Sequence, residues 1–156
     1  MKITDRLKVE HGVFLLQLRY VEELLRRHAP AATLVAAVET IAIAEENHST
    51  IEDRVLYPAL ATALGRDLPV LNLIEQDHQE AKDLVARIRA GETDEATVRR
   101  WVETLRTHME REIQATFALI EETISVERLV SMCNWEVDSI YGEMGKRTAW
   151  VEKWLG

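Results

Sequence analysis

The stretch from Leu34 to Ala59, LVAAVETIAIAEENHSTIEDRVLYPA, decides the fold. Apolar residues recur along it in steps of three and four, which is the period of a helix with one face turned to a core. Three polar residues, Glu45, His48 and Glu52, fall on the same stripe. The stretch therefore predicts a long amphipathic helix that carries polar side chains into the core, and Pro58 is expected to bend it.

Three further segments show the same helical period. The first runs from about Thr4 to His28, the third starts near Asp67 and Pro69, and the fourth begins after Gly91. The core stripes of these three segments read Leu7, His11, Leu15, Leu18 and Leu25; Leu71, Ile74, His78, Ala81, Val85 and Ile88; and Trp101, Leu105, His108, Glu112, Ala115 and Leu119. Glycine, proline and helix-capping residues separate the segments, so short loops are predicted between them.

These patterns predict an all-α fold in a single domain covering residues 1–156. Four helices with short connections are expected to form an antiparallel up-down-up-down four-helix bundle over about residues 4–124. A C-terminal helical extension, over about residues 125–156, begins at Ser125 and carries apolar residues at helical spacing. This extension covers one end of the bundle, forms a homodimer surface or binds a partner, and the sequence leaves the three roles open.

Composition excludes several classes of partner. The chain has 156 residues and a net charge of −8, with acidic and basic residues mixed along it. This mixture argues against nucleic acid or an anionic membrane as a partner. No apolar run approaches the roughly 18 residues that span a bilayer. Cys133 is the single cysteine, so no internal disulfide is expected, and the simplest location is the cytoplasm.

Four of the five histidines lie on the predicted core stripes. They are His11, His48, His78 and His108. In an antiparallel pair of helices, residues at one level are equidistant from the connecting turn. The midpoint of His11 and His48 falls at Ala29-Pro30, and the midpoint of His78 and His108 falls in the Gly91–Glu95 loop. All four histidines are therefore predicted to meet in one layer of the core.

Two glutamates join this layer. Glu52 follows His48 by four residues and Glu112 follows His108 by four, so each pair shares a helix face. Two buried carboxylates in one layer need cations, and no lysine or arginine lies beside them on the stripes. Four imidazoles and two bridging carboxylates suit two iron ions with an oxo or hydroxo bridge and open positions. Manganese and zinc are the expected substitutes.

The ordered set of six residues resembles the hemerythrin-like, or HHE cation-binding, family over about residues 4–124. The stretch from His48 to Pro58 is similar to the family's second helix, including the aromatic-proline pair. Oxygen-carrying hemerythrins have a second histidine one turn from His78, where this chain has Ile74 and Lys82, and an aspartate five residues after the last histidine, where it has Ile113. The set instead resembles iron-cluster repair, nitric-oxide-response and iron-sensing domains. Ferritin-like proteins use Glu-x-x-His pairs, which is the reverse order.

The resemblance implies a non-haem di-iron protein that binds or reduces nitric oxide, dioxygen or peroxide, with an electron donor as partner. The alternatives are a sensor or store for oxygen, nitric oxide or iron, with a signalling partner, and a structural bundle without metal. Glu45 is interpreted as a hydrogen-bond partner of a ligand histidine, with a structural pairing or direct ligation as alternatives. Tyr57 is predicted to point away from His48. The expected walls of the ligand pocket are Phe14, Leu15, Leu56, Ile74 and Leu105.

Overall fold

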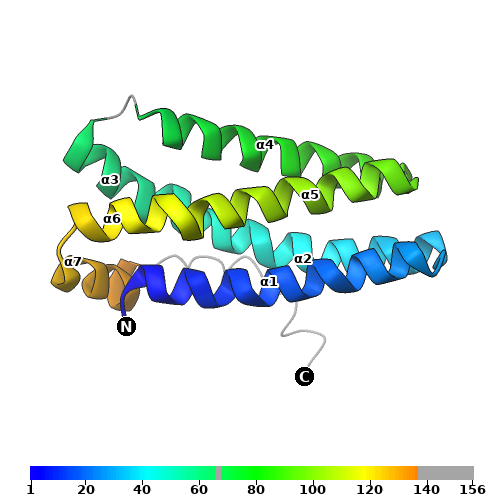
Figure 1. Cartoon of the computed structure of the whole chain (residues 1–156), viewed down its shortest axis with the longest axis horizontal. Coiled ribbons are helices and arrows are strands. Elements are labelled where there is room, and N and C mark those ends of the chain that lie inside the picture. Colours follow the sequence, from blue (N-terminus) through cyan, green and yellow to red (C-terminus); the bar gives the residue numbers. More distant parts are fainter. Residues whose placement is uncertain (66–67, 137–156) are drawn as a thin grey trace, which may run out of the picture.

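Four helical rods form the body of the computed structural model, which describes residues 1–65 and 68–136 (Figure 1). The rods are, in chain order, α1 (Ile3–Arg26); α2 (Ala31–Ile51) with the π-helical turn η1 (Glu52–Leu56) and α3 (Tyr57–Leu64); α4 (Pro69–Arg89); and α5 (Glu95–Arg111) with the π-helical turn η2 (Glu112–Thr116) and α6 (Phe117–Thr123). A short end piece follows, made of α7 (Val126–Ser131) and η3 (Met132–Glu136). Since no strand occurs in these residues, the all-α prediction is confirmed for them.

The loops occur where capping residues and glycine predict them. The side chain of Asp94 accepts a hydrogen bond from the backbone N–H of Thr97 and starts α5. Gly65 and Gly91 both have a backbone φ of 103°, a conformation that side chains with a Cβ rarely adopt. The side chain of Ser125 accepts a hydrogen bond from the N–H of Arg128 and starts α7, as predicted.

Each rod packs against at least two others, and the second and fourth rods also meet through α3 and α6. The helix α1 contacts α2 and α5, and α4 also contacts both α2 and α5, so the rods enclose one common core. The end piece lies against α1, and η3 also contacts η1. The predicted fifth segment is described only as far as residue 136, so its expected continuation and any homodimer surface on it lie outside the described residues.

Two apolar clusters occupy the core, one at each end of the rods. The Trp101 cluster includes Leu18, Val21, Leu34, Val38, Ile88, Trp101 and Leu105. The Phe117 cluster includes Ile3, Leu7, Ile51, Leu56, Ile74, Phe117, Leu129 and Met132. Along each rod the predicted polar core residues lie where the members of one cluster give way to those of the other. A polar layer is therefore enclosed between two apolar ones, and the end piece helps to close the Phe117 cluster. Cys133 is buried in that cluster as a small apolar residue, as predicted.

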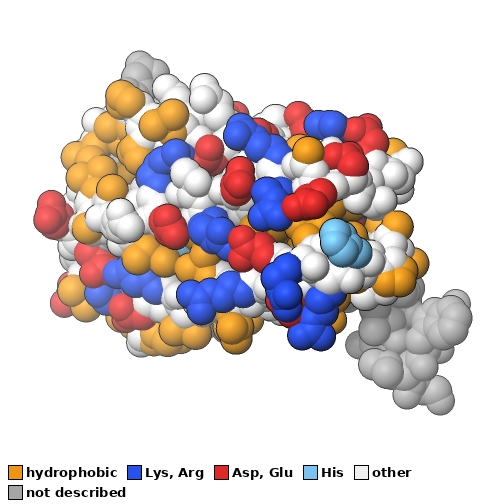
Figure 2. Space-filling model, turned by 45° about the vertical axis from the view of Figure 1, so that its right-hand side comes forward, with side chains coloured by type: hydrophobic (Ala, Val, Ile, Leu, Met, Phe, Trp, Pro, Cys, Tyr) orange, Lys and Arg blue, Asp and Glu red, His pale blue; other side chains and the backbone are white. Residues whose placement is uncertain are grey.

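The surface carries charges of both signs. Figure 2 shows acidic and basic side chains interspersed on the face it presents, with apolar patches between them. In the described part of the chain, no helix is both long and apolar enough to cross a bilayer.

One ion-pair network joins the two ends of the chain's main body. Lys2 and Lys8 each donate a hydrogen bond of 2.7 Å to the carboxylate of Glu121 on α6. Burial alone would raise the pKa of Glu121, but the hydrogen bonds from Lys2 and Lys8 outweigh it and lower the pKa to about 2. The charged carboxylate therefore stabilises the contact of α1 with α6 at neutral pH.

Glu121→Gln should lower the free energy of unfolding by about 1 kcal/mol at pH 7. Because the folded pKa lies below the ordinary value of 4.5, the contribution is fully present above about pH 4.5. It is then lost as the pH falls toward 2. Urea unfolding of wild type, Glu121→Gln and the exposed neighbour variant Glu122→Gln should show this difference only for Glu121. A difference that stays constant between pH 7 and pH 2 would contradict the assignment.

Candidate metal centre

The four histidines and two glutamates on the predicted stripes lie together in the polar layer. They are His11 on α1, His48 on α2, Glu52 at the start of η1, His78 on α4, His108 on α5 and Glu112 at the start of η2. None of the six is more than 4% exposed to solvent. The structure thus brings together, from all four rods, the complete set that the sequence singles out.

The six side chains form two groups of four with shared members. In each group, one donor atom from every residue lies within 4.8 Å of the others. The first group is His11, His48, Glu52 and Glu112, and the second is Glu52, His78, His108 and Glu112. Both carboxylates belong to both groups. This His/Glu cluster is able to bind metal, because imidazole nitrogens and carboxylate oxygens converge on two adjacent positions.

The imidazoles face one another through the same nitrogen. The Nε2 atoms of His11 and His48 are 2.8 Å apart, and the Nε2 atoms of His78 and His108 are 3.1 Å apart. The Nε2 atom of His48 is also 3.1 Å from a Glu52 oxygen, and that of His108 is 3.1 Å from a Glu112 oxygen. Four nitrogens and two carboxylates are therefore directed at a common interior, not at separate partners.

Several buried oxygens in this interior lack a hydrogen bond. Neither oxygen of Glu52, nor Oε2 of Glu112, has a hydrogen-bond partner among the described residues. Buried polar atoms are normally paired, and an unpaired carboxylate oxygen is costly. A bundle stabilised only by its own polar contacts would not leave these atoms without partners, whereas cations between them would satisfy them. The residues present therefore fit a metal centre.

The cluster also shifts the pKa values of its members. Burial would lower the pKa of His48, but Glu52 and Glu10 outweigh it and raise the pKa to about 10. Burial, together with the charge of His48, lowers the pKa of His11 to about 3. Burial and the nearby Glu52 raise the pKa of Glu112 well above its ordinary value. Cations that bind to these donors would displace the protons that the donors carry.

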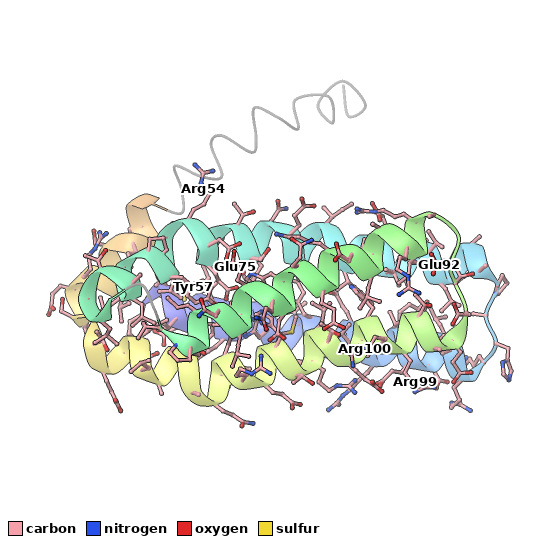
Figure 3. The ribbon with its side chains drawn as sticks, turned by 90° about the horizontal axis from the view of Figure 1, so that it is seen from above. Arg54, Tyr57, Glu75, Glu92, Arg99 and Arg100 are labelled. Carbon is pink, nitrogen blue, oxygen red and sulfur yellow. The ribbon has the colours of Figure 1, made fainter. Side chains whose placement is uncertain are left out.

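Tyr57 is a site residue for which the prediction was wrong. Its side chain is buried, and its hydroxyl donates a hydrogen bond to Oε1 of Glu112. In Figure 3, Tyr57 lies between the rods, while Arg54 projects from the surface. The prediction assumed a regular α-helix, in which a residue nine positions after His48 points to about the opposite side. The structure instead has the π turn η1 between them, so the register changes.

The π turns η1 and η2 each begin at a glutamate of the cluster. The N–H of Tyr57 bonds to the carbonyl of Glu52, and the N–H of Phe117 bonds to the carbonyl of Glu112. These bonds span five residues, one more than in an α-helix. The predicted second helix is therefore irregular after Glu52, and Pro58 falls in the first turn of α3. Phe117, which follows the second π turn, stacks on the ring of His11 with centroids 5.4 Å apart.

The other predicted site residues lie near the cluster in different surroundings. Glu45 is buried, and its burial raises its pKa. Its hydrogen bond to a ligand histidine remains a prediction. Phe14 packs edge-on against the ring of His48, at a centroid distance of 5.3 Å. Among the other expected pocket walls, Leu56 and Leu105 are fully buried in the two apolar clusters, Leu15 is partly buried, and Ile74 lines an open pocket. Their role around a ligand remains a prediction.

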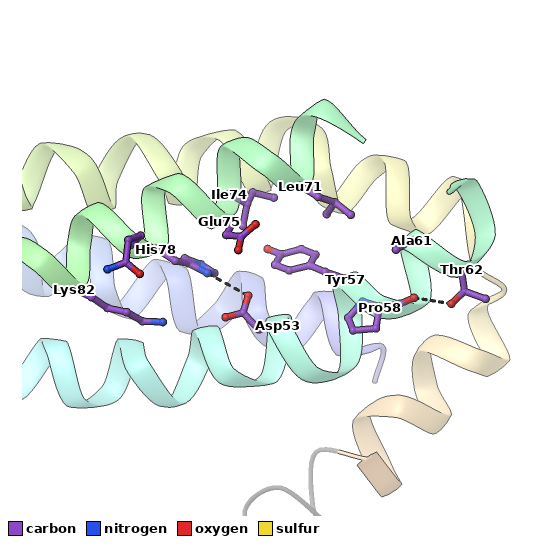
Figure 4. Close-up of a pocket in the computed structure, with 11 residues that line it drawn as sticks. Asp53, Tyr57, Pro58, Ala61, Thr62, Leu71, Ile74, Glu75, His78 and Lys82 are labelled. Carbon is purple, nitrogen blue, oxygen red and sulfur yellow. Dashed lines mark hydrogen bonds and ion pairs between the residues drawn. The ribbon is translucent and has the colours of Figure 1, made fainter. Parts of the chain in front are cut away.

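That open pocket leads from the surface toward the cluster. It has a volume of about 690 Å³ and lies between α3 and α4, with Asp53, Tyr57, Ile74 and His78 among its lining residues (Figure 4). Tyr57 and His78 belong to the pocket wall; His78 is itself a member of the cluster, and Tyr57 donates a hydrogen bond to Glu112. A small molecule in the pocket therefore lies beside one donor of the cluster and beside the tyrosine that holds another.

Comparison with known families gives one match. The model of the hemerythrin HHE cation binding domain matches residues 2–120, which confirms the resemblance inferred from the sequence. The matched region reaches from α1 into α6 and contains every residue of the two groups. No curated protein and no solved structure matches the chain.

Proposed function

Because the chain belongs to the hemerythrin HHE cation-binding domain family, we propose that it is a non-haem di-iron protein that binds or reduces a small ligand. In this proposal, one ion is held by His11, His48, Glu52 and Glu112, and the other by Glu52, His78, His108 and Glu112. The bound iron would supply a binding position and one-electron exchange for nitric oxide, dioxygen or peroxide.

The observation that carries the proposal is the sharing of both carboxylates between the two groups. Two separate four-donor sites would need eight side chains, whereas six suffice here because Glu52 and Glu112 belong to both groups. Carboxylates can bridge adjacent ions in this way, and the mixed nitrogen and oxygen set suits iron or manganese. Structural zinc sites are usually tetrahedral and closed, so a six-residue set with two positions is a poorer match to zinc.

The protein surroundings favour a small ligand. The Trp101 and Phe117 clusters exclude water from both sides of the layer, and the six donors are almost completely buried. The pocket beside Tyr57 and His78 offers the entrance. The hydroxyl of Tyr57 donates to Glu112, so this side chain both holds a carboxylate in place and lines the approach. A large substrate has no access to donors that are so enclosed.

We also propose that the chain is one domain whose four rods run antiparallel, in up-down-up-down order. Short connections between rods in contact support this order, and so does the packing of the end piece into the Phe117 cluster. A cytoplasmic location rests on the single cysteine of the sequence.

Metal content and the visible spectrum of protein purified in air test the proposal. We expect about two irons per chain and near-ultraviolet absorption typical of a bridged ferric pair. The reduced protein is then mixed in turn with nitric oxide, dioxygen and peroxide, with a reductant present. Turnover would identify an oxidoreductase, while reversible binding without turnover would favour the sensor or store. Absence of iron, together with failure to take up two metal ions anaerobically, would show the proposal to be wrong.

A further inference from the structure

The outward-facing nitrogens of the cluster histidines meet carboxylates that lie outside the two groups. The Nδ1 atom of His48 is 2.7 Å from Oε2 of Glu10, which is a hydrogen-bond distance. The Nδ1 atom of His78 is 3.3 Å from Oδ1 of Asp53, an ion-pair contact that Figure 4 shows beside the open pocket. In each case the Nε2 atom of the same ring faces the cluster.

These carboxylates come from neighbouring rods. Glu10 lies on α1 and reaches across to α2, while Asp53 lies in η1 and reaches across to α4. Each follows or precedes a cluster residue directly in the sequence, since Glu10 adjoins His11 and Asp53 adjoins Glu52. Each of these rods thus contributes a donor to the cluster. The adjacent residue in the sequence contributes a carboxylate to an imidazole of the next rod.

Glu10 is itself held in position. Its other oxygen, Oε1, accepts a hydrogen bond of 3.0 Å from Nε of Arg6, one turn earlier on α1. The carboxylate is therefore fixed at both ends, between Arg6 and His48. It is about a quarter exposed, so it stands at the border between the buried layer and solvent.

Of the four imidazoles only His48 has a hydrogen bond at Nδ1, and the Nδ1 atoms of His78 and His108 have no hydrogen-bond partner among the described residues. The Nδ1 atom of His108 is 3.7 Å from Asp77, and Asp77 also contacts Arg111, which competes for its charge. The Nδ1 atom of His11 has no hydrogen-bond partner among the described residues, and its ring stacks on Phe117 instead. The second group therefore has carboxylates beside both imidazoles, and the first group has one beside only His48.

A carboxylate at Nδ1 has a defined effect on a metal-binding imidazole. It holds the proton on Nδ1, so that the lone pair of Nε2 is directed at the metal, and it makes that nitrogen a better donor. Loss of such a partner typically lowers metal affinity about 10- to 100-fold. The number and closeness of these carboxylates therefore influence how firmly each position holds its ion.

We propose that Glu10 and Asp53 are positioning residues, one for each metal position. The inference rests on the proposed function, because it assigns the residues that tune the same centre. Glu10 would act through His48 and Asp53 through His78.

Release of Fe(II) to a coloured chelator tests the proposal under anaerobic conditions. Wild type should release its iron in two phases of equal amplitude. Glu10→Gln should accelerate one phase about 10-fold and leave the other unchanged. Asp53→Asn should accelerate the other phase by a similar factor and leave the first unchanged. Both variants replace a carboxylate with an amide of the same shape, so the packing is retained.

Matched variants separate this effect from the loss of any surface carboxylate. Glu22→Gln removes a carboxylate on α1 that pairs with Arg106, and Asp83→Asn removes one on α4 that accepts a hydrogen bond from Gln79. Both should release iron as wild type does. The proposal is wrong if Glu10→Gln and Asp53→Asn behave like these controls, or if each accelerates both phases equally.

A second measurement does not depend on iron. Nitrogen-15 spectra of the imidazoles in metal-free protein report the proton on Nδ1 of His48, which should shift strongly in Glu10→Gln and remain unshifted in Glu22→Gln. An unshifted signal in Glu10→Gln would overturn the assignment of Glu10. If wild type holds fewer than two irons while this shift is seen, the proposed function fails and the contact of Glu10 with His48 stands.

Discussion

Glu52→Gln should abolish metal binding at both candidate positions. Glu52 belongs to both groups, is fully buried, and has two oxygens without hydrogen bonds among the described residues. Glutamine keeps the shape but offers one oxygen and an NH₂ group, which repels a cation and removes a negative charge. We expect affinity for each ion to fall by at least about 100-fold, more than for the loss of an outer partner. Iron content after anaerobic reconstitution and dialysis measures it.

Glu39→Gln is the matched control for this variant. Glu39 lies on the same helix, α2, and pairs with Arg89 on the surface, away from the layer. It should bind iron as wild type does. If Glu52→Gln kept even one firmly bound ion, the sharing of this carboxylate between two positions would be incorrect. Circular dichroism of the metal-free variants should show the same helix content for both.

Phe117→Ala should cause a large loss of stability for a single core substitution. Phe117 is completely buried, is the aromatic centre of the Phe117 cluster, and stacks on His11. Removal of a buried aromatic ring typically lowers the free energy of unfolding by about 3–5 kcal/mol, because packing is lost and a cavity remains. Urea unfolding of the metal-free protein measures this loss. The variant should also loosen His11, whose Nδ1 has no other partner among the described residues.

Two further variants calibrate the result. Phe117→Leu retains much of the apolar volume and should lose roughly 1–2 kcal/mol. Leu16→Ala changes a side chain on α1 that is 66% exposed, and it should alter stability by less than about 0.5 kcal/mol. If Phe117→Ala lost no more than Leu16→Ala, Phe117 would not be a structural support for the polar layer.

The apolar period predicted the helices and the composition of the polar layer. Loop positions read from glycine and capping residues placed His11 opposite His48, and the structure brings their Nε2 atoms to 2.8 Å. The predicted position of His11 opposite His48 was correct because a residue's place on the stripe fixes the side of a regular helix that it occupies. The same reasoning correctly placed Glu52 and Glu112 in the layer of the four histidines.

The sequence could not predict where a helix departs from regular α geometry. It also could not predict site residues that lie beside the core stripe. Tyr57 was misplaced because no residue pattern identified the π turn before it. The local signal for this π turn is a glutamate on the core stripe followed by the aromatic-proline pair. Glu10 and Asp53 lie beside the core stripes, so the apolar period gave no signal for their contacts with His48 and His78. Their adjacency to His11 and Glu52 could have identified them as candidates.

The π turns η1 and η2 have a consequence for changes in chain length. A π turn holds one residue more than an α turn, so each is equivalent to a single-residue insertion directly after a cluster glutamate. Deletion of one residue within Glu52–Leu56 would restore α register and rotate α3 by about 100° relative to α2. That rotation would carry Tyr57 away from Glu112. The number of residues between Glu52 and Tyr57 must therefore stay the same. A change in that number would move Tyr57 even if no side chain of the rod were substituted.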